Sequence, residues 1–348
     1  MSKYRTALWI GAGAMGGGVL ATGLALSAAA LRRRPDLAGQ VVLITGGSRG
    51  LGFALAREFA RQGCRVAICA RNHDEVQAAA GSLERYGSVA GYVCDVTCQD
   101  EVEHLIEATI TRFGTIDILV NNAGEIQVGP VQSLTIEDFK AAMDVMFWGM
   151  VYSSMAVLPH FLRKESGRIV NITSIGGKVA VPHLLPYTSA KFAALGFSEG
   201  LRAELKGTGI AVTTVVPGLM RTGGHLNASF QGDVEREAVW FGLGATLPGI
   251  SINAERAARK IVHAAARGEA ETILSLPAKA IALWHGLFPG FTADALGWFN
   301  RLALPAGTSH QKVRGRDTRV LQSPWMKAVT ILGRRAADRL RENVEAVR

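Results

Sequence analysis

The sequence predicts an α/β fold built around a doubly wound parallel sheet of seven strands. Two observations predict it: short apolar runs alternate with helix-length segments from residue 40 onward, and a glycine-rich turn follows the first run. Such alternation is typical of βαβ units, whose parallel strands are joined by crossover helices. The expected strands are residues 40–45, 65–70, 89–94, 116–121, 168–173, 210–215 and 272–276.

The composition indicates a globular protein with a basic N-terminal region. Of the 348 residues, 48% are hydrophobic and 19% are charged, which suits a well-buried core. The net charge is +9, and residues 1–34 contribute +5 of it through five basic residues and no acid. Because these charges flank an apolar segment and do not form a stripe on a folded domain, we expect a membrane partner and no nucleic acid.

The apolar segment at residues 7–31 predicts a transmembrane helix. Its 25 uncharged residues are enough to cross the hydrocarbon core of a bilayer. Arg32, Arg33 and Arg34 follow it, and basic clusters stay on the cytoplasmic side. We therefore expect residues 1–35 to be a single-pass membrane anchor that keeps the rest of the chain in the cytoplasm. A signal peptide cleaved after the small residues near 30 is the alternative, and the three arginines oppose it.

Four cysteines, Cys64, Cys69, Cys94 and Cys98, are the candidates for thiolate chemistry. They contain no C-x-x-C pair, and no histidine lies nearby at the spacing of a metal site. We expect no metal, and we interpret the cysteines as small apolar side chains in a reducing compartment.

The turn after the first expected strand has the residues of a phosphate-binding loop. It reads TGGSRGLG and leads into a helix-like segment. Glycines let the backbone approach a pyrophosphate closely, and the N-terminus of the following helix attracts its negative charge. The loop residues expected to surround the cofactor phosphates are Thr45, Gly46, Ser48, Arg49, Gly50, Leu51 and Gly52.

Tyr187 and Lys191 stand four residues apart after the fifth expected strand. Residues at this spacing are neighbours on one face of a helix. An ammonium beside a phenol favours the phenolate, so we expect the pKa of Tyr187 to be lowered. A tyrosine tuned in this way acts as a general acid or base near neutral pH.

Together with several further motifs, this pattern resembles the short-chain dehydrogenase/reductase family over about residues 38–276. The shared motifs are the glycine loop, Asp95-Val96, NNAG at residues 121–124, Ser174 ahead of Y-x-x-x-K, and Pro217-Gly218 with Thr222. The resemblance implies a Rossmann-like sheet in the order 3-2-1-4-5-6-7 and a homo-oligomer, either a dimer or a tetramer. The long C-terminal extension is similar to that of membrane-anchored, hydroxysteroid-dehydrogenase-like members.

The resemblance also implies a role for each matched residue. Tyr187 is the catalytic acid or base, Lys191 lowers its pKa and holds the nicotinamide ribose, and Ser174 hydrogen-bonds the reacting oxygen. The reaction interconverts a secondary alcohol and a carbonyl. The implied cofactor contacts outside the loop are Asp95, Val96, Asn121, Ala123, Gly124, Tyr187, Lys191, Pro217, Gly218 and Thr222.

The end of the second strand indicates which cofactor is bound. NAD-preferring members place an acid there for the ribose 2′-hydroxyl, whereas this chain has Ala70 followed by Arg71, with Arg49 in the loop. Two guanidiniums suit a 2′-phosphate through charge-assisted hydrogen bonds, so we expect NADP(H). The plainer interpretation is that both arginines are simply solvated.

One position departs from the family pattern. The family carries N-x-x-G in the helix after NNAG, and that asparagine shapes a kink and completes a catalytic tetrad. Residues 146–149 here read MFWG, so Met146 replaces it, and a thioether cannot donate a hydrogen bond. Two functions remain open: an NADP(H)-dependent oxidoreductase, or an NADP(H)-binding scaffold or sensor with weak or lost turnover. The intact serine, tyrosine and lysine favour the enzyme.

The segments beside the predicted site are rich in apolar residues. The expected substrate lid, residues 219–250, contains Phe230, Trp240 and Phe241, and His183 lies on the opposite wall. These residues predict a hydrophobic alcohol or carbonyl substrate, with ordinary core packing as an equal alternative.

The predicted catalytic domain spans residues 36–276 and is followed by an extension, residues 277–348. Its first part, 277–304, is apolar and aromatic but is broken by a Pro-Gly pair, so we expect an interfacial or dimer-packing pair of helices. We expect the basic remainder, 306–348, to be loosely ordered apart from a helix near 325–343.

Overall fold

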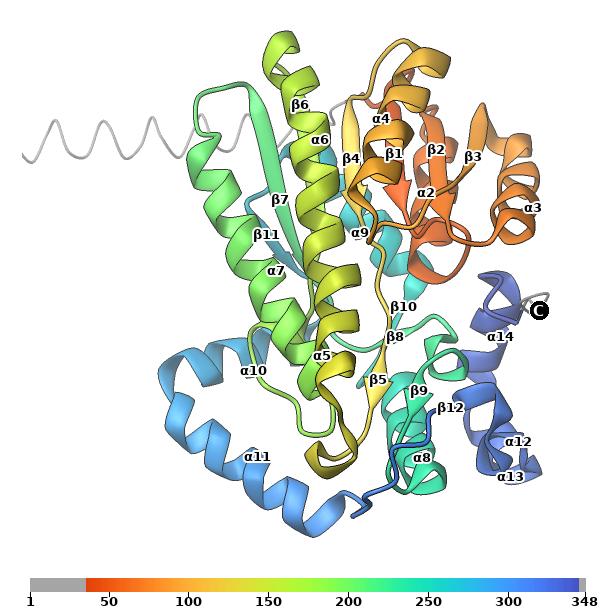
Figure 1. The fold of residues 1–348 in the computed structure, drawn as a ribbon, viewed down its shortest axis with the longest axis vertical. Coiled ribbons are helices and arrows are strands. Elements are labelled where there is room, and N and C mark those ends of the chain that lie inside the picture. The colour runs from red at the N-terminus through yellow and green to blue at the C-terminus, as the bar shows by residue number, and fades with distance from the viewer. Residues whose placement is uncertain (1–35, 344–348) are drawn as a thin grey trace, which may run out of the picture. The chain divides into compact units, whose positions relative to one another are not determined.

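A computed structural model describes residues 36–343 of the chain (Figure 1). From Leu37 onward the chain forms one compact unit. The predicted transmembrane helix at residues 7–31 lies outside the described residues.

A parallel sheet of seven strands forms the centre of this unit. Its strands are β1 (Val41–Thr45), β2 (Arg65–Ala70), β3 (Val89–Val93), β4 (Ile118–Asn121), β6 (Gly167–Ile172), β7 (Ile210–Val216) and β11 (Glu271–Ile273). Their order is β11-β7-β6-β4-β1-β2-β3, which confirms the predicted order of the seven main strands. Every residue of β1 is buried, because a parallel strand covered on both faces needs an unbroken apolar run such as VVLIT.

Helices cover both faces of the sheet, as a doubly wound fold requires. One face is covered by α2 (Gly50–Arg61), α3 (His73–Leu83) and α9 (Ala254–Arg267). The other is covered by α4 (Gln99–Phe113), α6 (Gly149–Lys164) and α7 (Leu185–Glu204). In Figure 1, α6 and α7 run across the near face and α9 lies behind the sheet.

The long helix that follows β4 changes its winding around Met146. Helix α5 (Ile136–Met143) continues through a π-helical turn, η3 (Asp144–Trp148), into α6. Such turns often mark functional sites. Among the described residues, this continuous helix, Ile136–Lys164, is the one long and apolar enough to cross a membrane. It packs against α4 and α7, as a helix that covers a sheet does.

The C-terminal extension packs on the lid. A small sheet joins β5 (Gln127–Val128), β9 (Ser229–Phe230) and β12 (Val313–Arg314). Beyond it, α12 (Arg319–Gln322), α13 (Pro324–Val329) and α14 (Ile331–Arg339) follow, and α12 and α14 contact α8 (Val234–Thr246) of the lid. The expectation of loose order after residue 306 is therefore wrong for the described part, because Leu321 and Met326 are fully buried in the lid's core. The helix expected near 325–343 is present as α13 and α14.

Two further helices, α10 (Leu276–Leu287) and α11 (Pro289–Ala303), form the hairpin expected at residues 277–304. They pack mainly on each other, and Figure 1 shows them extending along one end of the molecule. Their outer surface is apolar. Its most exposed members are Leu276, Leu283, Leu287, Phe291, Trp298 and Leu302.

Candidate active site

The glycine loop is held in place by the NNAG segment that follows β4. Thr45 Oγ1 accepts hydrogen bonds from the backbone N–H groups of Asn122 (3.0 Å) and Ala123 (3.1 Å). Asn122 Nδ2 donates two bonds of 3.0 Å, to the carbonyls of Thr45 and Gly46. Two motifs that are distant in sequence are thereby joined at the carboxyl edge of the sheet, where ligands bind in open α/β folds.

Close packing explains the glycines of this loop. Gly46 has a φ of +64°, and a Cβ there would lie 2.9 Å from Ala123 Cα. A Cβ on Gly52 would collide with the carbonyl of Gly46. Gly50, the first residue of α2, also has a left-handed φ of +58°. The loop therefore presents backbone at the helix N-terminus, an arrangement that fits the pyrophosphate of a dinucleotide.

The three predicted catalytic residues gather beyond the end of β6. Ser174 caps the short helix η4 (Ile175–Gly177), where its Oγ accepts the backbone N–H of Gly176 at 3.0 Å. Tyr187 lies in the first turn of α7. A Cβ on Gly176 would lie 3.2 Å from Tyr187 Cε1 and 3.5 Å from Ser174 Oγ, so hydroxyl and phenol lie against the same glycine.

Lys191 lies one turn along α7 from Tyr187, with its side chain in the interior. Its Nζ donates to the carbonyl of Ile172 at 2.9 Å and lies 5.8 Å from the centroid of the Tyr187 ring. Burial lowers the pKa of Lys191 to about 8. The helical spacing therefore brings ammonium and phenol together, as the sequence predicts.

The pKa of Tyr187 moves in the direction opposite to the prediction. Removal of the phenol from water raises its pKa, and the opposing effect of the hydrogen bond with Ser174 is smaller. The prediction considered the lysine charge alone, whereas the structure buries Lys191, removes part of Tyr187 from water and engages the ammonium with the Ile172 carbonyl. The phenol therefore keeps its proton at neutral pH, which is the form that a general acid needs.

Met146 packs beside the predicted acid. It is 1% exposed and belongs to an apolar cluster with Ala142, Ala190 and the half-buried Tyr187. A Cβ on Gly124 would lie 3.5 Å from Met146 Cγ, so the thioether also covers the end of the NNAG segment. The change in helix winding is present although the family's asparagine is not. Met146 is thus an accommodated packing residue.

The arginines expected near a 2′-phosphate lie toward solvent. Arg71 follows β2 and is exposed. Arg49 forms ion pairs with Glu75 at 3.8 Å and with Glu342 at 3.9 Å. Sequence reasoning missed both carboxylates. Glu75 had a local signal, as an acid in the first turn of α3, whereas Glu342 approaches the loop only through the tertiary fold.

The predicted adenine contact lies in a tight turn after β3. Asp95 Oδ1 accepts from the backbone N–H of Thr97 at 3.0 Å and from its hydroxyl at 2.9 Å. Val96 is buried against α6, since a Cβ on Gly149 would lie 2.9 Å from Val96 Cγ2. This turn therefore fixes the start of α6.

The segment predicted to cover the nicotinamide contacts the serine loop. The carbonyl of Pro217 accepts the N–H of Ile175 at 2.7 Å, next to Ser174. Thr222 Oγ1 accepts the N–H of Gly224 at 3.0 Å and so shapes the turn that follows. Gly218 lies against Ser275, since a Cβ there would be 2.8 Å from the Ser275 hydroxyl.

Asn121 faces the domain interior. Its Nδ2 donates to Ser154 Oγ at 3.0 Å and to Asn171 Oδ1 at 2.8 Å. The network continues from Asn171 to Ser198 at 3.0 Å and from Ser198 to Thr214 at 2.7 Å. This buried polar chain, which the sequence did not indicate, joins β4, β6 and β7 to their helices beneath the candidate site.

The lid contains both core and polar contacts. Phe230 and Phe241 are buried with Leu321 and Met326, so these two aromatics are core residues. His183 Nδ1 lies within hydrogen-bond distance, 2.6 Å, of one carboxylate oxygen of the buried Glu237, whose other oxygen accepts the indole N–H of Trp240 at 2.6 Å.

The cysteines lie apart from these contacts. Cys64, Cys69 and Cys94 are buried and Cys98 is half-buried. In the described part of the chain, no group of three or more His, Cys, Asp or Glu side chains is placed to hold a metal ion.

Comparison with known proteins agrees with this geometry. A Rossmann-like sheet with a glycine loop and a Ser-Tyr-Lys grouping defines a nucleotide-dependent oxidoreductase, and residues 40–230 match the family described as short chain dehydrogenase. The chain belongs to the short-chain dehydrogenase family.

Individual relatives include steroid dehydrogenases and a ketoreductase. The chain is 32% identical over 302 residues to 11-beta-hydroxysteroid dehydrogenase 1A of Arabidopsis thaliana, covering 84% of this chain and 83% of the relative. It is 36% identical over 202 residues to 17-beta-hydroxysteroid dehydrogenase 13 of Mus musculus, covering 57% and 66%. A crystal structure of actinorhodin polyketide ketoreductase with NADPH superposes with a TM-score of 0.61 at 29% identity, covering 68% of this chain and 95% of that one.

Proposed function

We propose that the protein is an NADP(H)-dependent oxidoreductase that interconverts a secondary alcohol and a carbonyl on a hydrophobic small molecule. The observation that carries this proposal is the grouping of Ser174, Tyr187 and Lys191 beyond β6. The neighbouring glycine loop supports a dinucleotide cofactor, and the related ketoreductase with NADPH supports its identity.

In this mechanism the protein supplies the proton and stabilises the negative charge that develops. A bound NADPH would provide the hydride for the carbonyl carbon. Tyr187, whose pKa is raised by burial, gives its proton to the carbonyl oxygen. Ser174 lies beside the phenol and hydrogen-bonds the same oxygen as negative charge develops. The Lys191 ammonium, 5.8 Å from the ring, stabilises the phenolate that remains.

An apolar lid supports a hydrophobic substrate. Tyr187 packs at the edge of the lid's cluster, next to buried residues such as Leu184 and half-buried ones such as Trp240 and Leu243. Apolar area removed from water contributes roughly 25 cal/mol per Å², so a nonpolar ligand gains affinity beside these residues. The steroid dehydrogenases among the relatives point the same way.

Cofactor preference tests the role of Arg71. The double substitution Ala70→Asp and Arg71→Ser removes a cation from the expected 2′-phosphate and adds an acid for a ribose hydroxyl. We expect affinity for NADPH to fall by roughly tenfold to a hundredfold, since a charge-assisted contact contributes about 1.5–3 kcal/mol. NADH affinity should hold or rise.

Fluorescence titration of both cofactors measures this preference. Arg163→Ser, which removes an exposed arginine near the end of α6, is the matched control and should change neither affinity. An unchanged ratio of NADPH to NADH affinity in the double variant would remove Arg71 from the site.

We also propose that the protein acts at a membrane. The predicted anchor at residues 7–31 stays a prediction, and the α10–α11 hairpin offers a second contact. Its exposed Trp298, Leu283 and Phe291 are residues that insert into a bilayer interface.

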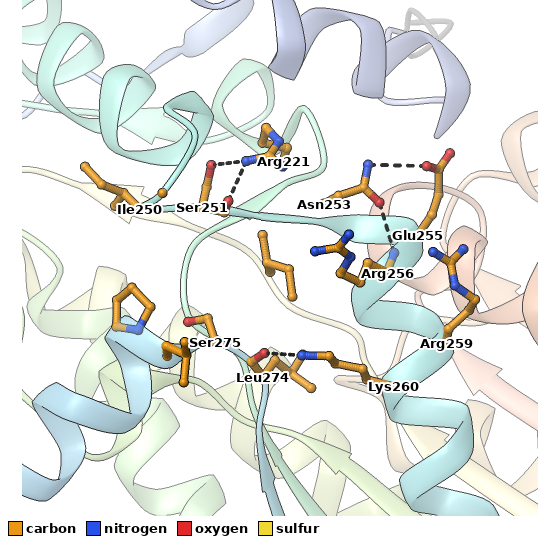
Figure 2. A pocket seen from close by; sticks show the side chains of 14 residues that line it. Arg221, Ile250, Ser251, Asn253, Glu255, Arg256, Arg259, Lys260, Leu274 and Ser275 are labelled. Atoms are coloured by element: carbon orange, nitrogen blue, oxygen red, sulfur yellow. Dashed lines mark hydrogen bonds between the residues drawn. The ribbon is translucent and has the colours of Figure 1, made fainter.

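A basic cavity at the base of the hairpin strengthens this proposal (Figure 2). The cavity measures about 710 Å³ and begins at Leu276, where α10 starts. Its cations are Arg221, Arg256, Arg259 and Lys260. The one acid in its lining, Glu255, is already paired with Arg57 and Arg339, each at 3.3 Å. Excess positive charge beside an apolar surface suits an anionic lipid surface.

Sedimentation with vesicles tests the hairpin separately from the anchor. A chain beginning at Asp36 is expected to bind vesicles of phosphatidylcholine with phosphatidylserine and to bind pure phosphatidylcholine less. Leu283→Glu with Trp298→Glu should reduce binding to both, whereas Arg256→Ala with Arg259→Ala should remove only the preference for the anionic lipid. Equal sedimentation of all three proteins would refute this contact.

The expected homo-oligomer, a dimer or tetramer, remains part of the proposal. Exposed apolar residues, Trp148 at the end of η3 with Met155 and Leu162 of α6, lie along the outer face of this continuous helix. Burial of such a stripe between copies would remove it from water.

A further inference from the structure

The last described turn of the chain lies against the glycine loop. Just after α14, the carbonyl of Leu340 accepts the backbone N–H of Gly50 at 2.8 Å. The Glu342 carboxylate approaches so closely that a Cβ on Gly50 would collide with it. In this fold, N–H groups at the start of the first helix and the space over a loop glycine serve a pyrophosphate. Residues 340–342 therefore occupy the space beside the glycine loop in which a cofactor pyrophosphate is expected.

The same residues also hold the segment that follows Thr222. Asn227 Nδ2 donates to the Glu342 carboxylate and, at 3.1 Å, to the Glu342 carbonyl. Arg316 Nη2 donates to that carbonyl at 3.2 Å. Gly223 approaches the preceding helix so closely that a Cβ would collide with Ala337. The C-terminal segment thus bridges the glycine loop and the segment predicted to cover the nicotinamide.

The negative charge on Glu342 is unfavourable in its buried position. Burial raises the pKa of Glu342 to about 6 and Glu75 adds to the rise, whereas Arg49, Arg316 and the hydrogen bond from Asn227 oppose it. The pKa of Glu342 in the docked segment lies above the ordinary pKa of a glutamate. Docking is therefore strongest when the Glu342 carboxyl is protonated, and it weakens as the pH rises through about 6. Near neutral pH the docked segment is therefore an occupant that a better anion can displace.

We propose that residues 340–342 compete with the cofactor for its site, and that Glu342 lowers the affinity for NADP(H) more than the affinity for NAD(H). This proposal rests on the proposed function. The Gly50 N–H cannot donate to the Leu340 carbonyl and to a phosphate oxygen at once. The 2′-phosphate of NADP(H) likewise competes with the Glu342 carboxylate for the Arg49 guanidinium, which is predicted to bind that phosphate. NAD(H) has no 2′-phosphate, so this competition does not arise with it.

Cofactor affinities of the full-length protein measure this competition. Glu342→Ala removes the carboxylate from over Gly50, together with its hydrogen bond from Asn227 and its ion pair with Arg49. We expect it to bind NADPH about tenfold more tightly and NADH with a smaller gain, because the docked segment is weakened and one charge-assisted contact of Arg49 is freed. Glu107→Ala removes an exposed acid from α4, on the opposite face of the sheet from α2, and should leave both affinities unchanged.

Hydrogen exchange provides a readout that is independent of charge. Adding NADPH should speed amide exchange at residues 340–343 while it slows exchange at residues 46–52. Protection of both segments, or equal NADPH affinity in wild type and Glu342→Ala, would mean that the segment is a fixed wall of the site; the proposal would then fail and the proposed function would stand. If neither protein binds NADPH, both fail.

Discussion

Tyr187→Phe is expected to lower turnover by about 100-fold to 10,000-fold while NADPH still binds, because it removes the proton of the general acid. The ring that remains can keep its packing against Met146 and Ala190 and at the edge of the lid. The melting temperature should therefore change little. Loss of NADPH absorbance in the presence of a carbonyl measures turnover, and fluorescence titration measures affinity.

Tyr92→Phe is the matched control for this substitution. Its hydroxyl donates to the Ala108 carbonyl at 3.4 Å, away from the candidate site, so turnover should stay near that of the wild type. If Tyr187→Phe keeps near-normal turnover, another group moves the proton and the assignment of Tyr187 is wrong.

Lys191→Met is expected to lose both turnover and cofactor affinity. The ammonium that stabilises the phenolate disappears, together with the ribose contact that the family resemblance implies. We expect turnover to fall at least about 100-fold and NADPH affinity about tenfold. Methionine keeps the apolar stem in a position where Lys191 is 4% exposed, so the core should stay filled.

The pH dependence of carbonyl reduction provides a second readout of Lys191. Since burial lowers its pKa to about 8, the ammonium is present below that pH and is lost above it. The rate for the wild type should therefore decline as the pH rises through about 8. Lys206→Met replaces an exposed lysine just beyond α7 and should show the same decline. A wild-type rate that does not decline as the pH rises through about 8 would contradict the role of Lys191.

The parts of the structure that follow local patterns are those that the sequence predicts. The run VVLIT has the composition of a strand buried on both faces, and β1 is that strand. The spacing of Tyr187 and Lys191 places them on one helix face wherever the helix lies. The turn after β1 needs glycine at Gly50 because its φ is positive, and that requirement is visible in the residue itself.

What the sequence did not predict depends on residues that meet only in the folded chain. Whether Met146 leaves a polar gap or fills space is decided by its neighbours, among them Ala142 and Ala190. The pKa of Tyr187 is governed by burial that no i, i+4 rule contains. The contact between Glu342 and the glycine loop joins the two ends of the described chain, and no periodic pattern signals such a pairing.

The choice between oxidoreductase and binding scaffold is tested most directly by NADPH oxidation with a panel of hydrophobic ketones and aldehydes. The full-length wild type and Tyr187→Phe are compared at equal NADPH saturation. We predict carbonyl-dependent oxidation by the wild type that the variant loses, with both proteins binding NADPH. Tight NADPH binding by both proteins with no carbonyl-dependent oxidation by either, for any member of the panel, would contradict the enzyme and favour the scaffold.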